Sequence, residues 1–198
     1  SDTQPFTVGG LEPQTNYTFT VKAICGGGEE SEWATPATFK THCDVIVVTD
    51  DEPYFDDFEA SENFVCWQTE IVSGIDDWVI DPGYLILNNT AFFIWMGGEA
   101  MLISTPLDLT AVSYPTLTFN HKQMVGLSYG TVDQLIVGYR TDKNDVWHTL
   151  LNFTEATGDW ETVTVALPNP SATYQIVFNG IGHDAEGVYV DDVWVGNN

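Results

Sequence analysis

The chain has 198 residues, of which 43% are hydrophobic and 13% aromatic, so it is able to bury a substantial core. Its 5 basic and 29 acidic residues give a formal net charge of −24, which repels phosphate backbones and excludes nucleic acid as a partner. The longest apolar run, AFFIWM from Ala91 to Met96, is far shorter than the roughly 20 residues of a membrane helix, so membrane insertion is not expected.

The first predicted strand begins at Tyr17 and places Phe19 and Val21 on the same face, with threonines on the other. Leu11, Pro13 and Tyr17 have the spacing of a tyrosine corner. In this motif the tyrosine ring packs inward while its hydroxyl bonds to the backbone upstream. A Gly-rich turn and a second short strand follow, which predicts a small β segment over residues 1–42.

This segment resembles the last three strands of a fibronectin type III domain. The residues that carry the resemblance are Leu11, Tyr17, Val21, Ala23, Ser31, Trp33, Phe39 and Thr41. Three strands cannot close a sandwich, so we expect the segment to expose apolar side chains unless another part packs on it. The chain begins in the middle of this pattern, which suggests a piece of a longer protein with further domains.

Residues 43–198 have the length of one domain and alternate apolar and polar residues in short runs. No window keeps helical periodicity over three turns, and turn residues separate the runs. Alternation without helices predicts an all-β sandwich or barrel. The clearest predicted strands cover residues 116–122, 133–140, 160–167, 173–180 and 187–195.

The ends and the middle of this domain resemble the MAM-like jelly rolls and, more closely, the cleaved-adhesin or choice-of-anchor J modules of secreted bacterial surface proteins. The matching residues, in order, are Phe58-Glu59, Cys66-Trp67, Asp76-Asp77-Trp78, Ser104 to Leu109 and Val190-Asp191-Asp192-Val193. The resemblance implies an antiparallel jelly-roll sandwich with structural calcium. It also implies a non-catalytic adhesion or interaction module, secreted or at the cell surface, whose partner is a host or cell-surface protein or glycan.

Acidic residues crowd the start and the end of the domain, and the first and last strands of a jelly roll lie near each other. Converging carboxylates repel one another unless a hard cation such as Ca²⁺ neutralises them. An acid within an apolar strand, such as Asp191, is also costly unless it is paired or coordinated. Glu59, Asp77 and Asp191 are therefore the predicted Ca²⁺ ligands, and a solvated acidic surface is the alternative.

The chain has three cysteines, Cys25, Cys43 and Cys66. Cys25 and Cys43 are expected at opposite ends of the first hairpin, too far apart for a disulfide. We expect a Cys43–Cys66 disulfide that staples the domain entrance, with Cys25 reduced and in the core of the segment. Three free, buried thiols are the alternative, and no CxxC spacing indicates a metal site.

Motifs that suggest catalysis lack the context that the chemistry needs. Gly126 to Gly130 matches G-x-S-x-G, but an alternating strand follows it where a nucleophile elbow requires a helix. The four histidines form no metal-ligand pattern. Carboxylate pairs occur by chance among so many acids, so a glycosidase is not indicated. We therefore do not expect an enzyme.

The run from Ala91 to Met96 is apolar on both faces, with Phe93 and Trp95 on one of them. Such a strand is either buried on both sides or presents an aromatic platform, on which sugars and protein partners bind. Phe93 and Trp95 are the candidate ligand-binding residues. The alternative function is therefore a carbohydrate-binding module accessory to a glycan- or protein-degrading enzyme on the same longer chain.

Overall fold

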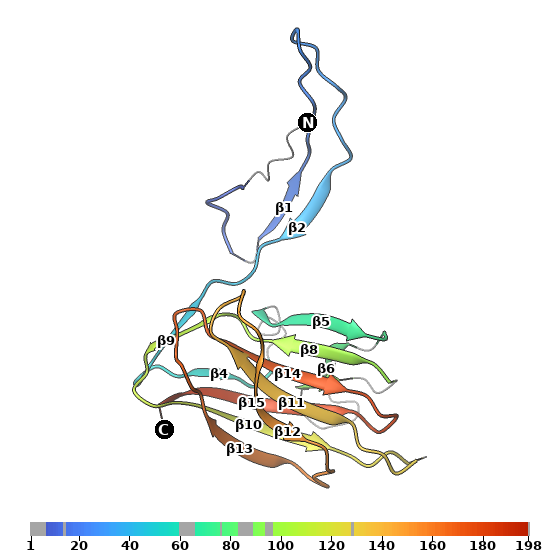
Figure 1. Cartoon of the computed structure of the whole chain (residues 1–198), viewed down its shortest axis with the longest axis vertical. Coiled ribbons are helices and arrows are strands. Elements are labelled where there is room, and N and C mark those ends of the chain that lie inside the picture. The colour runs from blue at the N-terminus through green and yellow to red at the C-terminus, as the bar shows by residue number, and fades with distance from the viewer. Residues whose placement is uncertain are drawn as a thin grey trace. The chain divides into compact units, whose positions relative to one another are not determined.

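The structure is a computed structural model in which residues 7–13, 15–59, 66–75, 77–82, 89–93, 97–127 and 129–197 are described, without the side chains of 80–82 and 89–90. The chain divides into two compact units, Ser1–Asp44 and Val45–Asn198 (Figure 1). This division falls close to the boundary expected after residue 42. Each unit is described by itself below.

The first unit is built on an antiparallel hairpin of β1 (Asn16–Phe19) and β2 (Ala37–Lys40). Tyr17 lies opposite Phe39, and their rings are stacked with centroids 5.9 Å apart. The backbone N–H of Glu12 donates a 2.9 Å hydrogen bond to the hydroxyl of Tyr17. This bond is the predicted tyrosine corner, which is confirmed.

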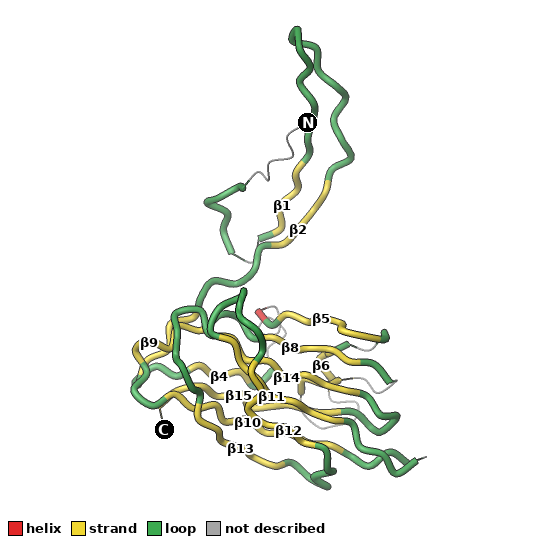
Figure 2. Tube along the Cα trace, in the orientation of Figure 1, coloured by secondary structure: helices red, strands yellow, loops and turns green. Residues whose placement is uncertain are grey.

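The second unit consists of short strands joined by turns and loops (Figure 2). Its described strands are β3 (Ile46–Thr49), β4 (Tyr54–Asp56), β5 (Gln68–Ser73), β6 (Trp78–Pro82), β7 (Asn89–Phe93), β8 (Glu99–Ile103), β9 (Leu107–Ala111), β10 (Pro115–Gln123), β11 (Gln134–Arg140), β12 (His148–Phe153), β13 (Glu161–Ala166), β14 (Gln175–Ile181) and β15 (Val188–Asn197). No helix in the described part of the chain is long and apolar enough to cross a membrane.

Two large sheets make up the sandwich of the second unit, and a separate two-stranded pair accompanies them. Sheet I has the order β13-β10-β15-β7-β6, with β4 also paired to β15, and sheet II has the order β12-β11-β14-β8-β5. Neighbouring strands in both sheets are antiparallel, whereas β3 and β9 form a parallel pair. The predicted all-β jelly-roll sandwich is therefore confirmed, with the parallel β3–β9 pair as an addition that alternation does not predict.

The core lies between the two sheets, because alternate residues of each strand point inward. Leu117 and Phe119 of β10 face Leu135 and Val137 of β11, and all four side chains are fully buried. The ring of Phe119 lies 5.2 Å from that of Phe178 across the sandwich. Burial of each such side chain contributes about 1.5–3 kcal/mol to stability.

A buried carboxylate, Asp56, holds together the first residues of the second unit by hydrogen bonds. Its oxygens accept hydrogen bonds from the Phe58 backbone N–H at 3.0 Å, the Trp67 indole N–H at 2.8 Å and the Tyr54 hydroxyl at 3.1 Å. Phe58 adopts φ 54° and is fully buried. Three donors thus offset the cost of taking this charge out of water.

A second buried carboxylate, Asp133, holds the loop before β15. It accepts hydrogen bonds from the backbone N–H groups of His183 at 2.6 Å and Gly187 at 2.7 Å, and a longer one from Ala185 at 3.3 Å. Asp133 is fully buried. Both acids are therefore structural, and Asp56 is so although it stands in the acidic stretch at the start of the domain.

Candidate functional site

Two of the predicted Ca²⁺ ligands, Glu59 and Asp191, lie close enough to influence each other. Burial is the main cause that raises the pKa of Asp191 to about 7. A hydrogen bond from the Asp192 backbone N–H acts in the opposite direction and lowers this pKa. The charges of Asp192, Glu59 and Asp57 raise this pKa further. The structure thus gathers carboxylates around the last strand, as the jelly-roll topology predicts.

The third predicted ligand, Asp77, is engaged elsewhere. Its side chain accepts hydrogen bonds from the Thr69 hydroxyl at 3.2 Å and from the Trp78 backbone N–H at 2.8 Å. Asp77 is not among the charges that raise the pKa of Asp191. Over the described residues, no group of three or more His, Cys, Asp or Glu side chains is arranged to hold a metal ion. Ca²⁺ binding therefore stays a prediction, and Glu59 and Asp191 are the residues that fit it.

The three cysteines differ in oxidation state. Cys43 and Cys66 are both disulfide-bonded, whereas Cys25 is a free thiol. Cys25 is exposed, which corrects the expectation that it lies in the core of the first unit. The correction has a simple reason, since Cys25 sits near the tip of the hairpin beside Ile24, which is itself 73% exposed.

Phe93 does not form an exposed platform, and this prediction is wrong. Its side chain is fully buried, with its ring 5.7 Å from that of Trp78. Strand β7 lies between β15 and β6 in sheet I, so Phe93 faces the core, while Phe92 on the opposite face stacks on Tyr189 at 4.5 Å. The other candidate, Trp95, lies outside the described residues.

The outer face of sheet II carries an arrangement of polar side chains that the sequence analysis missed. Because Leu135, Val137 and Tyr139 point into the core, Gln134 and Arg140 of the same strand point outward. The amide of Gln134 donates a 2.7 Å hydrogen bond to Asn152 Oδ1 on the neighbouring strand β12.

Two further side-chain pairs lie on this face. On the other side of β11, the Asn179 amide donates a 2.8 Å bond to Glu99 Oε1. Asn179 is 8% exposed, and its Oδ1 has no hydrogen-bond partner within the described residues. Arg140 donates from Nε and Nη2 to Gln175 Oε1 at 2.9 and 2.7 Å. These bonds hold the planar groups in fixed orientations.

Apolar side chains lie between these pairs. Ile136 of β11 lies opposite Asn179, and Val177 of β14 lies opposite Gly138, so both point outward. At the end of the face the guanidinium of Arg140 covers the ring of Trp147 at 4.4 Å. An apolar floor with a few oriented polar groups is the usual composition of a ligand site.

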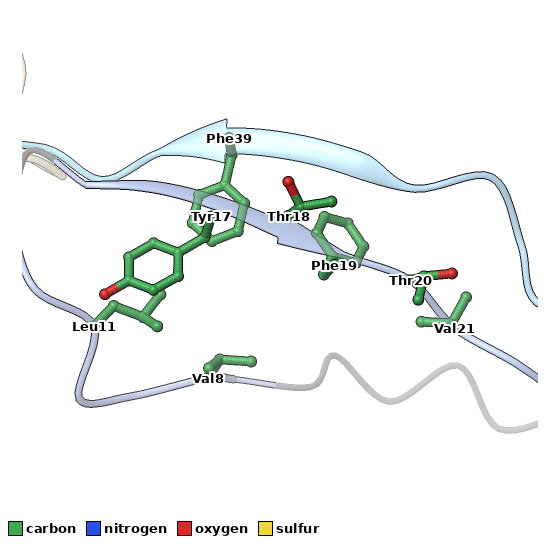
Figure 3. A pocket seen from close by; sticks show the side chains of 8 residues that line it. All are labelled: Val8, Leu11, Tyr17, Thr18, Phe19, Thr20, Val21 and Phe39. Carbon is green, nitrogen blue, oxygen red and sulfur yellow. The ribbon is translucent and has the colours of Figure 1, made fainter.

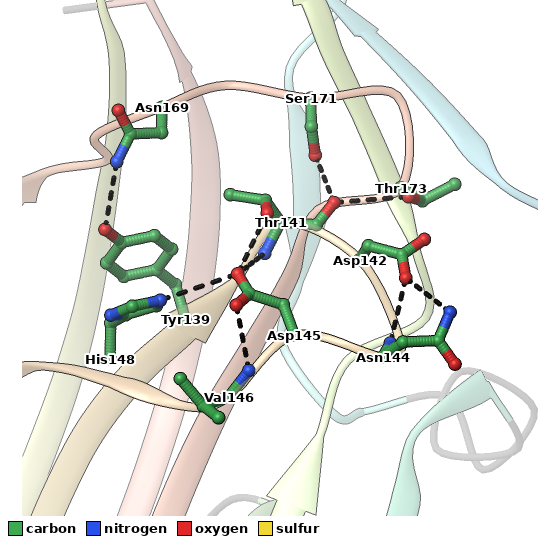
Figure 4. A network of polar contacts seen from close by, with 10 residues as sticks. All are labelled: Tyr139, Thr141, Asp142, Asn144, Asp145, Val146, His148, Asn169, Ser171 and Thr173. Carbon is green, nitrogen blue, oxygen red and sulfur yellow. Dashed lines mark hydrogen bonds and ion pairs between the residues drawn. The ribbon is translucent and has the colours of Figure 1, made fainter.

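The loop that carries Trp147 is locked by polar contacts (Figure 4). Asp145 Oδ2 accepts a 2.9 Å hydrogen bond from the Thr141 hydroxyl and lies 3.5 Å from His148 Nε2. The carbonyl of Thr141 accepts bonds from the Ser171 hydroxyl at 2.6 Å and the Thr173 hydroxyl at 3.2 Å. Hydrogen bonds from Thr141 lower the pKa of Asp145, which keeps it ionised. These contacts fix the loop next to Arg140.

The first unit exposes an apolar surface, as predicted. Phe19 is 52% exposed, Val21 59% and Val8 59%. Together with Leu11, Tyr17 and Phe39 they line a shallow apolar pocket of about 640 Å³ (Figure 3). The tyrosine corner and this uncovered face agree with a partial β-sandwich, and the fibronectin type III identity of the segment stays a prediction.

Comparisons with solved structures show the same jelly-roll fold in several domains. The K1 cleaved adhesin domain of Lys-gingipain from Porphyromonas gingivalis W83 is similar at 21% identity and TM-score 0.56, covering 74% of this chain and 98% of that one. Its K3 domain is similar at 20% identity and TM-score 0.54, covering 73% and 97%. TmCBM61, solved with β-1,4-galactotriose, is similar at 11% identity and TM-score 0.50, covering 72% and 94%.

No protein-family model matches the chain, and no curated protein matches it either. At these identities the structural likeness establishes the fold, and the site must be argued from its own residues.

Proposed function

We propose that the chain is a non-catalytic adhesion module of a secreted or cell-surface multidomain protein and that it binds its partner through the outer face of sheet II. One observation carries the proposal. Asn179 is almost fully buried with its amide nitrogen fixed on Glu99, yet its Oδ1 has no partner within the described residues. A buried polar atom without a partner is uncommon, and a ligand donor that reached it after a local side-chain movement would satisfy it.

A glycan is the ligand that this surface favours. Sugar hydroxyls donate and accept, and Asn179 Oδ1 and the Glu99 carboxylate offer acceptors while Arg140 offers donors. The apolar floor and the Trp147 ring suit the C–H faces of a sugar. The cleaved adhesin domains and TmCBM61 share this fold, and TmCBM61 was solved with a galactose trisaccharide, which supports the same ligand class.

A second candidate function uses the same surface. A carbohydrate-binding module accessory to a glycan- or protein-degrading enzyme also requires oriented amides beside an aromatic ring. The two functions differ in the domains that accompany this one on the longer chain. An attached catalytic domain favours the accessory module, and tandem adhesive repeats favour adhesion.

Structural Ca²⁺ is part of the proposal. Glu59 and Asp191, with Asp57 beside them, are carboxylates whose mutual repulsion a bound cation relieves. The ion would supply positive charge at the junction of the first and last strands and no chemistry. The binding surface lies on the other sheet, so the ion is not assigned a role in ligand contact.

A glycan array with the whole chain tests the proposal. We expect binding to a restricted set of neutral glycans and a loss of most of this signal in Asn179→Ala and Trp147→Ala. Thr164→Ala, on the outer face of sheet I, is the matched control and should leave binding unchanged. The proposal is wrong if the outer-face variants bind the same glycans as strongly as the control.

A further inference from the structure

One row of side chains crosses the outer face of sheet II. Glu70 of β5, the last strand in the order of this sheet, lies opposite Met101 of β8, which in turn lies opposite Asn179 of β14. The row continues to Ile136 of β11. Residues that are directly opposite each other in a sheet share a face, so Glu70 is on the same face as Asn179. Glu70 is also exposed, and its carboxylate therefore stands at the rim of the proposed binding surface.

A second carboxylate lies on the same face, next to Asn179. Glu99 comes two residues before Met101 on β8, so the two side chains point to the same side of the sheet. Glu99 Oε1 accepts the 2.8 Å hydrogen bond from the Asn179 amide, which holds this carboxylate in place. A ligand group that lies over Asn179 therefore meets negative charge from both Glu70 and Glu99.

The arginine on this face does not offer a ligand the donor pair that binds a carboxylate best. That pair consists of two parallel N–H groups, and in Arg140 the groups on Nε and Nη2 both donate to Gln175 Oε1, at 2.9 and 2.7 Å. Gln175 is 3% exposed, and its own amide donates to the Ser104 carbonyl at 2.8 Å, which fixes its orientation. Nη1 of Arg140 donates to the Lys143 carbonyl at 3.3 Å. Arg140 keeps further N–H groups that suit a single hydroxyl, whereas the parallel pair is occupied.

Carboxylates also surround the guanidinium group of Arg140. Burial lowers the pKa of Arg140, and the charges of Glu70, Asp142 and Asp145 act in the opposite direction and raise it. Glu70 has the largest effect of these three charges, so it lies close enough to interact with Arg140. The positive charge of Arg140 is therefore balanced within the protein itself and is not left over for an anionic ligand.

We propose that Glu70 makes the outer face of sheet II selective for uncharged glycans, so that this face rejects glycans with carboxylate or sulfate groups. The inference rests on the proposed function and adds the charge class of the ligand and the residue that sets it. An anionic sugar over Asn179 faces Glu70 and Glu99, and no free pair of arginine donors compensates the repulsion. An uncharged sugar avoids this repulsion. Glu70 thus determines specificity by excluding the wrong ligand and not by contacting the right one.

The test is a glycan array, probed with the whole chain, on which uncharged glycans stand beside their uronate, sialylated and sulfated counterparts. We expect wild type to bind uncharged glycans and not the acidic counterparts. Glu70→Lys should raise the signal of the acidic counterparts about fivefold or more at about 0.05 M NaCl, because it turns repulsion into attraction. Glu70→Gln should raise this signal less, because it only removes the repulsion. Both variants should bind the uncharged glycans as wild type does.

Salt checks that the effect is electrostatic. The gain of Glu70→Lys toward acidic glycans should disappear at about 1 M NaCl, where the Debye length is roughly 3 Å. Asp51→Lys is the matched control, because Asp51 is exposed and lies between β3 and β4, outside sheet II. This substitution changes the net charge of the protein by the same amount as Glu70→Lys, and it should leave binding to the array unchanged.

Three results would overturn the inference: wild type binds the acidic counterparts at least as strongly as the uncharged glycans, Glu70→Lys gains no acidic binding, or Asp51→Lys gains as much as Glu70→Lys. In each of these cases the proposed function still stands if Asn179→Ala loses binding to the glycans that wild type selects. An array on which wild type binds no glycan overturns both. Failure of the inference is therefore distinguishable from failure of the proposed function.

Discussion

The indole N–H of Trp67 donates a 2.8 Å hydrogen bond to Asp56, a carboxylate that is only 3% exposed. Replacing Asp56 with Ala removes this bond and those from Tyr54 and Phe58, and leaves buried donors unsatisfied. We expect Asp56→Ala to lower the free energy of unfolding by about 3 kcal/mol or more, measured by urea denaturation.

The matched control is Asp51→Ala, an exposed acid in the same stretch of chain, which should change stability by less than about 0.5 kcal/mol. Equal effects of the two substitutions would show that Asp56 is no more structural than a surface acid.

Asp56 also shows where reasoning from the sequence ends. Alternation predicted strands such as 133–140 and 173–180, which are observed as β11 and β14, because side-chain period depends on local spacing alone. Whether one acid in a cluster is buried depends on partners that are distant in sequence, such as Trp67 for Asp56. Composition therefore could not separate structural acids from solvated ones.

The same limit explains the misplaced binding site. A strand that is apolar on both faces, such as the one with Phe93, is equally consistent with an exposed platform and with a buried strand. The polar residues Gln134 and Asn179 do stand out within apolar strands of the sequence. Their partners, Asn152 and Glu99, follow from strand register, which alternation does not determine.

Burial lowers the pKa of His121 on β10, and this predicts a pH dependence of stability. The unfolded chain binds a proton at His121 below about pH 6.5, whereas the folded protein does so only at lower pH. Unfolding therefore takes up protons in this window. The contribution of neutral His121 to the free energy of unfolding is fully present above about pH 6.5 and is lost as the pH falls towards the pKa of His121 in the folded protein.

His121→Phe should remove this contribution, so the stability of the variant relative to wild type should increase as the pH falls from 8 to 5. Urea denaturation at several pH values measures it, with His42→Gln at an exposed position as the control. If the difference in the free energy of unfolding between wild type and His121→Phe stays constant with pH, the lowered pKa of His121 is contradicted.

Ca²⁺ should stabilise the second unit through Glu59 and Asp191. Ca²⁺ at a concentration one hundred times its dissociation constant adds about 2.7 kcal/mol to the free energy of unfolding. This corresponds to a rise in Tm of about 5 °C or more. Asp191→Asn should melt at a higher temperature than wild type in chelator, because it removes a buried like charge, and should gain less from Ca²⁺. Identical melting in Ca²⁺ and chelator would leave the acidic clusters as a solvated surface.

The cysteine states predict one intramolecular disulfide. Peptide mapping without reductant should join the peptide that holds Cys43 to the one that holds Cys66, and Cys25 should react with a thiol reagent. Closing a loop of this length contributes about 3 kcal/mol in the chain-entropy picture, so reduction should lower Tm. The substitution Cys25→Ser should leave Tm unchanged. A linked Cys25 peptide would contradict the pairing.

The central claim is that the ligand binds on the outer face of sheet II. The most direct measurement is an NMR map of amide shifts on titration with a glycan that the array selects, starting with β-1,4-galactotriose as the first probe. We predict that the shifts cluster around Gln134, Arg140, Trp147 and Asn179, and that Asn179→Ala abolishes them. Shifts that cluster instead on the outer face of sheet I, around Thr118 and Thr164, would contradict the claim.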